Sequence, residues 1–164
     1  MSKRNDSSDD ALSGESELIF WMGKYAAVLP RDRRYCRNHM WCQAQGERWR
    51  FGFTSFAVRL MQDVYFLDWY IREGDWVDSW QHIGHIETSK ATADLFAPLA
   101  GRLVEINQAL LQDPSPINLD GYGAGWLFAM SEVRGESWDA EQYKAFLEAT
   151  WEETQRTLKG DINR

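Results

Sequence analysis

GHIETSKATAD, residues 84–94, places a single lysine, Lys90, in a run of small, acidic and β-branched residues. The segments around it, residues 82–87 and 91–97, are both compatible with β-strands, and Thr88-Ser89-Lys90 lies between them. We therefore expect a β-hairpin with Lys90 near its tip and its amine in solvent. Taken alone, the stretch also fits an ordinary surface lysine in a polar turn.

The composition is that of one ordinary soluble domain. The chain has 164 residues, of which 44% are hydrophobic and 26% charged, so it is long enough to bury a core. Its formal net charge of −7, without a block of Lys and Arg, argues against binding to nucleic acid or to an anionic membrane. Cys36 and Cys42 are too few for a disulfide framework and indicate a reducing cytoplasm.

The middle of the chain favours short strands. Between Arg48 and Met130 the apolar residues come in short runs, separated by Gly, Asp or Pro, such as RWRFGF, DVYFLDWYI, RLVEIN and GWLFAM. Thr54 is a suitable N-cap for the following SFAVRLM, which predicts a short internal helix. The Pro-rich residues 113–116 and the Gly-rich residues 120–125 are expected to form loops.

The two ends of the chain differ from this middle part. Residues 1–29 are expected to be a disordered leader plus a short apolar segment, 18–30, which is too short and too interrupted to span a membrane. That segment predicts a short surface helix or a docking segment. Residues 30–131 form the expected domain, and residues 132–164 a helix and tail, with Ser137 as the N-cap of a helix that covers the β core.

The remaining candidates for chemistry carry little signal. His82 and His85 are three apart on an expected strand, so they should face opposite sides, and we predict no metal site. Cys36 and Cys42 should lie beyond disulfide reach unless the chain turns between them. Three tryptophans precede the hairpin and are expected either to pack in the core or to form an aromatic docking face: Trp69, Trp76 and Trp80.

Several motifs in fixed order resolve the ambiguity about the lysine. The tract Glu87-Thr88-Ser89-Lys90-Ala91 is preceded by a Pro/Asp/Tyr/His/Trp pattern over residues 30–41 and by Gly52-Phe53-Thr54. Downstream motifs are Asp94-Leu95, Pro98-Leu99, Gly101, Glu105, Asn107, Ala109-Leu110, Pro114, Asn118, Asp120, Tyr122-Gly123 and Gly125-Trp126. Over about residues 30–150 the chain resembles the glycine cleavage H protein, a lipoyl-carrier family.

The resemblance implies a mainly β barrel-sandwich hybrid of the lipoyl/biotinyl type, with a short internal helix and a C-terminal helix. It implies lipoate attached as an amide to Lys90, and a carrier without catalytic residues of its own. The implied partners are a lipoate ligase or lipoyl transferase, a dihydrolipoamide dehydrogenase-type reductase and the enzymes that load and unload the arm. Gly84 matches a family glycine and is expected to relieve crowding within the sandwich.

Three further residues are candidates for contacts near the arm. Glu87 and Asp94 flank the expected tip, where they either help a ligase or partner recognise it or act as solvated charges that resist edge aggregation. Met40 stands where the family usually has a glutamate, whose carboxylate the resemblance assigns, with Asp94, to holding the amine of the loaded arm. A thioether cannot replace the roughly 1.5–3 kcal/mol of such a charged hydrogen bond.

The cargo is therefore open at this point. Met40 suits an apolar or sulfur cargo, so we lean to an H-like lipoate-binding protein that works with a heterodisulfide-reductase-like complex in sulfur oxidation. The alternative is the H protein of the glycine cleavage system, which carries an aminomethyl group from glycine decarboxylase to aminomethyltransferase. A third possibility is a relay that passes lipoyl groups to other proteins.

Overall fold

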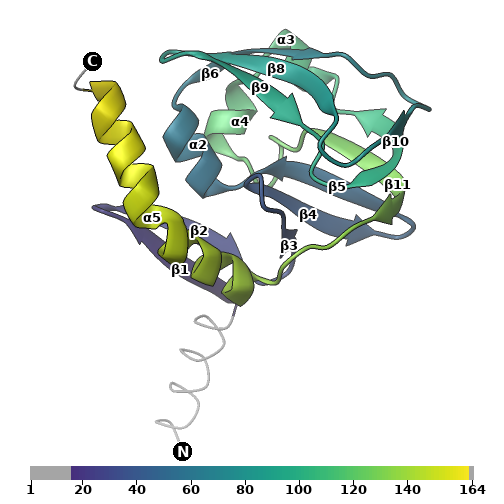
Figure 1. Ribbon diagram of the computed structural model, residues 1–164. Helices are drawn as coiled ribbons and strands as arrows, with labels where there is room; N and C mark the ends of the chain where they lie inside the picture. Colours follow the sequence, from purple (N-terminus) through teal and green to yellow (C-terminus); the bar gives the residue numbers. More distant parts are fainter. Residues whose placement is uncertain (1–15, 163–164) are drawn as a thin grey trace, which may run out of the picture.

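A computed structural model describes residues 16–162, with side chains described through Arg156 (Figure 1). The predicted disordered leader falls mostly outside this range. Two antiparallel sheets enclose the main core, in the strand orders β3-β4-β5-β11-β10-β7 and β6-β8-β9. The first contains β3 (Arg34–Tyr35), β4 (Met40–Gln45), β5 (Arg48–Phe53), β7 (Trp76–Val77), β10 (Ala100–Ile106) and β11 (Phe128–Arg134). The second contains β6 (Val64–Trp69), β8 (His82–Thr88) and β9 (Thr92–Phe96).

The mainly β prediction is confirmed, because the apolar runs fill the space between these sheets. Phe51 and Phe128 are cross-strand partners, and their rings stack with centroids 5.1 Å apart. Ile83 and Ile86 of β8 face them from the smaller sheet and are fully buried. Burying one such side chain contributes about 1.5–3 kcal/mol, so these short strands are stabilised mainly by packing.

The predicted internal helix is present as α2 (Ser55–Met61). The Thr54 hydroxyl accepts a hydrogen bond from the Ala57 N–H at 3.2 Å, as an N-cap should. Two other short helices are present, α3 (Ala109–Gln112), where the sequence predicted no element, and α4 (Ser115–Leu119), which begins inside the predicted loop of residues 113–116. The loop prediction was wrong at α4 because a proline favours the first turn of a helix, where its missing N–H costs nothing.

The apolar segment after the leader is a β-hairpin, not the predicted surface helix. It consists of β1 (Glu17–Met22) and β2 (Tyr25–Pro30), joined by a turn in which Gly23 has φ +65°. The inward side chains alternate along both strands: Phe20, Met22, Ala27 and Leu29. This alternation is the strand period of two, which the short length of the segment concealed.

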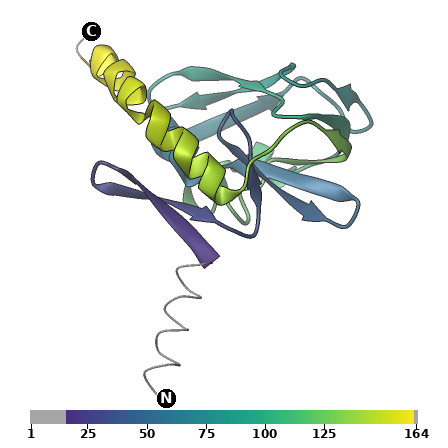
Figure 2. The same ribbon diagram turned by 60° about the horizontal axis from the view of Figure 1, so that its bottom comes forward.

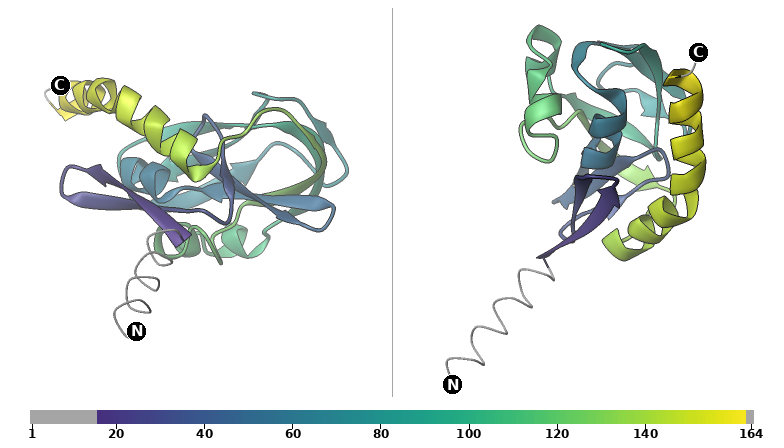
Figure 3. Two further views of the ribbon diagram at one scale, coloured as in Figure 1. Left: turned by 90° about the horizontal axis from the view of Figure 1, so that it is seen from below. Right: turned by 90° about the vertical axis from the view of Figure 1, so that its left-hand side faces the viewer.

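The C-terminal helix α5 (Ala140–Ile162) lies across this hairpin, as Figures 2 and 3 show. Together they form a second core, in which the Phe20 ring meets Trp151 edge-on at 5.6 Å. The predicted N-cap, Ser137, was wrong. Asp139 caps the helix instead, since its carboxylate accepts from the Gln142 N–H at 2.8 Å while the Gln142 side chain accepts from the Asp139 N–H.

Ser137 instead accepts hydrogen bonds from Arg34 through both of its oxygens, which connects the start of the larger sheet to the segment before α5. The Arg34 guanidinium donates to the Ser137 hydroxyl and carbonyl, each at 2.7 Å. Nearby, the Tyr35 and Tyr143 rings stack in parallel at 4.7 Å, which joins α5 to the start of the larger sheet. The helix therefore covers one end of the β core, as the sequence predicts.

His39 makes the stability of this packing depend on pH. Its Nδ1 lies 2.9 Å from the Tyr143 hydroxyl, and burial lowers its pKa from 6.5 to about 4. Between these values the unfolded chain binds a proton that the folded protein does not bind. The contribution of neutral His39 to the free energy of unfolding is therefore fully present above pH 6.5. It is lost as the pH falls toward 4, which lowers the free energy of unfolding by about 3 kcal/mol. Urea denaturation across this range should show that loss, and His39→Asn should remove most of its slope.

Candidate functional site

The turn between β8 and β9 holds Lys90 at its tip, which confirms the hairpin that the sequence predicted. Thr88 is 6% exposed and fixes the turn, because its hydroxyl accepts from the N–H groups of Lys90 and Ala91 at 3.2 Å each. The Thr88 N–H also donates to the Ala91 carbonyl at 2.9 Å. Ser89, Lys90 and Ala91 are all exposed. The lysine amine is thus presented in solvent on a turn held by backbone hydrogen bonds, with small neighbours on both sides.

The tip is supported from below by β6 and by Asn118 of α4. Val64 is the cross-strand partner of Thr88. The Asn118 side-chain amide pairs with the Val64 backbone in both directions, accepting at 3.0 Å and donating at 2.9 Å. The Asn118 side chain thus makes the two hydrogen bonds to Val64 that the backbone of a neighbouring strand would make. This pairing holds the start of β6, and through it the base of the lysine turn.

Glu87 and Asp94 both lie on the outer face of the hairpin. Glu87 is half-buried and paired with Thr92, two positions from the turn. Asp94 is exposed and pairs with His85 in register, and its carboxylate lies 3.1 Å from Nε2 of His82. Two carboxylates therefore lie beside the lysine tip on its solvent side, in reach of a protein that approaches it.

Met40 lies in the main core and is 1% exposed. It begins β4 opposite Phe53, behind a turn that Asn38 connects to the end of β9 by donating to the Phe96 carbonyl at 3.0 Å. The thioether therefore packs among apolar groups. This position offers no carboxylate to an ammonium ion.

The two histidines of β8 lie on the same face, which corrects the prediction of opposite faces. A register shift between His82 and Gly84 inserts one extra residue, so that His82 and His85 both point outward. The Tyr70 ring lies between them, 5.1 Å from His82 and 5.6 Å from His85. A strict alternation fails here because a β-bulge adds a residue on one strand only.

Trp80 alone of the three tryptophans suggested as a docking face is largely exposed, at 53%. Trp69 packs edge-on against Phe128 at 5.5 Å. Trp76 is half-buried beneath Arg102 and Arg134, whose guanidinium groups lie 5.6 and 5.3 Å from its ring. Core packing thus accounts for Trp69, and cation–π contacts account for Trp76.

The two cysteines are brought together by the turn between β3 and β4. Both are buried and free, and the Cys36 N–H donates to the Met40 carbonyl. Contact with the Cys42 thiol and burial raise the pKa of the Cys36 thiol well above its usual range. Cys36 therefore stays in the unreactive thiol form at neutral pH.

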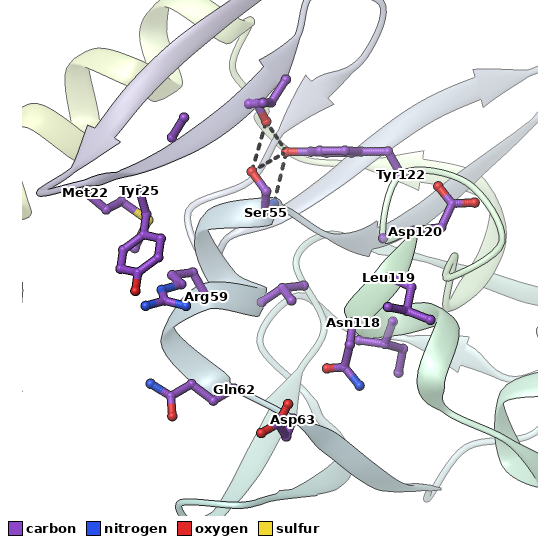
Figure 4. A pocket seen from close by; sticks show the side chains of 15 residues that line it. Met22, Tyr25, Ser55, Arg59, Gln62, Asp63, Asn118, Leu119, Asp120 and Tyr122 are labelled. Atoms are coloured by element: carbon purple, nitrogen blue, oxygen red, sulfur yellow. Dashed lines mark hydrogen bonds between the residues drawn. The ribbon is translucent and has the colours of Figure 1, made fainter.

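A pocket of about 760 Å³ lies between the N-terminal hairpin, α2, and α4 with the segment that follows it (Figure 4). Its walls carry Tyr25 and Arg59, whose guanidinium stacks 3.2 Å above the tyrosine ring. On the opposite side, the Tyr122 hydroxyl donates to the Val28 carbonyl. Lys90, Glu87, Asp94 and Met40 are not among its lining residues.

The comparisons with known proteins agree with this geometry. The family model for the glycine cleavage H-protein matches residues 33–158. The chain belongs to that family. It is 32% identical over 127 residues to the glycine cleavage system H protein of Carboxydothermus hydrogenoformans, covering 74% of this chain and 96% of that protein. It is 37% identical over 118 residues to the one from Beutenbergia cavernae, covering 71% and 94%.

A solved structure agrees with this assignment. The crystal structure of a glycine cleavage system H protein from Mycobacterium marinum matches with a TM-score of 0.65 and 35% identity, covering 71% of this chain and 97% of that one. The predicted barrel-sandwich hybrid is confirmed. H proteins carry lipoate covalently on a lysine and are carriers, not catalysts, as the resemblance implied.

The N-terminal hairpin lies before the segment that matches the family. The family match begins at residue 33, so the hairpin β1–β2 precedes it. In the described part of the chain, no helix is both long and apolar enough to cross a membrane.

Proposed function

We propose that this H protein carries lipoate on Lys90 and shuttles an aminomethyl group from glycine decarboxylase to aminomethyltransferase in the cytoplasm. The observation that carries the proposal is Lys90 at the exposed tip of the β8–β9 turn, within the segment that matches the family. The relatives at 32–37% identity are named for the glycine cleavage system, which favours this pathway over the sulfur oxidation toward which Met40 pointed.

The residues at the tip fit the attachment of lipoate. Exposed Ser89 and Ala91 leave room for a lipoate ligase or lipoyl transferase around the amine of Lys90. The amide removes the charge of the lysine, and the attached group supplies a dithiolane at the end of a long flexible chain. Thr88 holds the backbone of the turn, so the arm swings from a fixed point. A dihydrolipoamide dehydrogenase-type reductase is the expected partner for reoxidation.

A sulfur cargo, handled with a heterodisulfide-reductase-like complex, is the second candidate. It is favoured by Met40, which is buried and offers no carboxylate where the family usually has one. The two functions differ in whether the arm must hold a positive charge. Glu87 and Asp94 carry carboxylates on the outer face of the lysine hairpin that could hold the ammonium group of an aminomethyl-loaded arm. The Asp94 carboxylate also pairs with His82.

Loading by glycine decarboxylase separates the two functions. We expect the lipoylated protein, incubated with that enzyme and glycine, to gain the mass of methylamine on the peptide that contains Lys90, because one dithiolane sulfur takes the aminomethyl group, the other becomes a thiol and the carboxyl group of glycine leaves as CO2. The M. marinum H protein serves as the positive control. If the control is loaded and this protein is not, the aminomethyl function is excluded and a sulfur cargo is favoured.

A further inference from the structure

The outer face of the smaller sheet forms a regular array beside Lys90. It consists of three rows across β6 with the adjoining Tyr70, β8 and β9, in order from the lysine: Phe66, Glu87 and Thr92; Asp68, His85 and Asp94; Tyr70, His82 and Phe96. We call these nine residues the outer array. The sheet lies at the top of Figure 1, with its outer face away from the main core.

Large rings are exposed on the outer array. Phe66, Tyr70 and Phe96 are 43%, 51% and 39% exposed, respectively. They are joined through the two histidines, because successive ring centroids lie 5.1–5.7 Å apart from Phe66 through His85, Tyr70 and His82 to Phe96. Contiguous exposed apolar surface of this kind marks interaction sites, whereas scattered single residues do not.

The array is also acidic. Its three carboxylates, Asp68, Glu87 and Asp94, are accompanied by no Lys or Arg at the other six positions. Each carboxylate is adjacent to at least one ring in the register of the strands. Arginine and lysine side chains suit such a surface, because a guanidinium can stack on an aromatic ring while it pairs with a carboxylate.

The ring contacts preorganise this surface. The Tyr70 hydroxyl and Nδ1 of His85 form a hydrogen bond, and Nε2 of His82 pairs with the Asp94 carboxylate at 3.1 Å. The bulge at Gly84 makes this possible, because it places both histidines outward around one tyrosine. Fewer side-chain rotamers therefore have to be frozen when a partner binds.

The position of the array next to Lys90 limits which partner can use it. Rows two residues apart along a strand are about 7 Å apart, so the array ends within about 20 Å of the lysine. A lipoyl-lysine arm of about twelve bonds reaches roughly 15 Å when extended. An enzyme that receives the end of the arm must therefore sit close to this sheet.

We propose that the outer array is the docking surface for a partner enzyme that presents arginine and lysine side chains beside the entrance to its active site. The proposal rests on the proposed function, which makes glycine decarboxylase the partner to test. The array positions the enzyme, and the swinging arm enters its active site from the end of the same sheet.

A triple variant on β6 and the adjoining Tyr70, called the β6 variant, tests the proposal without changing any residue of the lysine hairpin β8–β9: Phe66→Ala, Asp68→Asn and Tyr70→Ala. The control triple variant, Trp21→Ala, Glu47→Gln and Leu119→Ala, removes the same kinds of exposed groups elsewhere. For glycine decarboxylase acting on the lipoylated proteins, we expect the β6 variant to raise KM roughly tenfold with kcat retained, and the control to match wild type.

A second measurement needs no loaded arm. Lys90→Arg is made alone and in combination with the β6 variant, and neither protein can take lipoate. Each is then used as a competitive inhibitor while glycine decarboxylase loads lipoylated wild-type protein. We expect Ki to rise roughly tenfold in the β6 variant. Wild-type Ki should also rise as NaCl increases from about 50 to about 300 mM, and less so in the variant that lacks Asp68.

The outcomes separate the two proposals. If lipoylated wild type is not loaded at all, the proposed function fails, whatever the array does. If wild type is loaded but KM and Ki are unchanged in the β6 variant, the docking proposal is overturned. It is also overturned if sedimentation shows a wild-type dimer that the β6 variant dissociates while KM is unchanged, since the array then joins two copies of this chain. Melting temperatures near that of wild type verify that both triple variants fold.

Discussion

Lys90→Arg is expected to abolish lipoate attachment and, with it, all carrier activity. Arginine keeps the positive charge and the length of the side chain, but its guanidinium stays protonated and does not form the amide. The residue is exposed at the tip of a turn that is held by Thr88 and the backbone, so the fold should not change. Intact mass measurement after incubation with lipoate, ATP and a lipoate ligase should show no lipoyl adduct.

Lys144→Arg is the matched control for this loss. Lys144 lies on α5, 4.0 Å from the Glu148 carboxylate, and a surface pair of this kind contributes little to stability. Its lipoylation and its loading by glycine decarboxylase should equal those of wild type. A lipoyl adduct that persists in Lys90→Arg, or one that disappears in Lys144→Arg, would place the attachment on another lysine.

Most of the β fold could be predicted from local patterns, because short apolar runs bounded by Gly, Asp and Pro leave little room for helices. The segment with β1 and β2 was mistaken for a helix since a two-residue turn at Gly23 interrupts its alternation after only six residues. The inward residues of this hairpin are buried by α5, which lies more than a hundred positions later in the chain. Such long-range packing overrides local propensity.

The lysine site could be predicted more completely than its surroundings. A turn between two strand-like segments suffices to expose Lys90, and the motifs around it supply the chemistry. The outer array could not be predicted, because it depends on a bulge that changes which side of β8 His82 faces. The available signal was Gly84 itself, since a glycine inside a strand pattern indicates a bulge or a close backbone contact.

The burial of Met40 in the core could likewise not be predicted from the sequence. Comparison with the family assigns the position to an arm cleft, whereas the structure packs the side chain opposite Phe53 at 1% exposure. Asp94 is exposed but engaged with His82. The family resemblance grouped these two residues, and only the tertiary structure shows that Met40 is in the core and Asp94 on the outer face.

Gly84→Ala is expected to destabilise the protein by about 3 kcal/mol or more, as overpacking against backbone does. A Cβ at this position would lie 2.3 Å from the Asp68 carbonyl oxygen and 3.1 Å from the Trp69 ring. The close atom belongs to the backbone of β6, so no side-chain rotation relieves the contact. The strands must separate, or the bulge that turns both histidines outward must be lost.

Gly46→Ala separates this crowding from the general effect of replacing a glycine. Gly46 lies in the β4–β5 turn with φ +65°, and a Cβ there meets nothing within 4 Å. Its cost is that of one left-handed residue, about 1–2 kcal/mol. Urea denaturation followed by tryptophan fluorescence gives both values. A loss in Gly84→Ala no larger than in Gly46→Ala would mean that β6 and β8 can move apart cheaply, and the outer array would then be too loose to hold a partner in place.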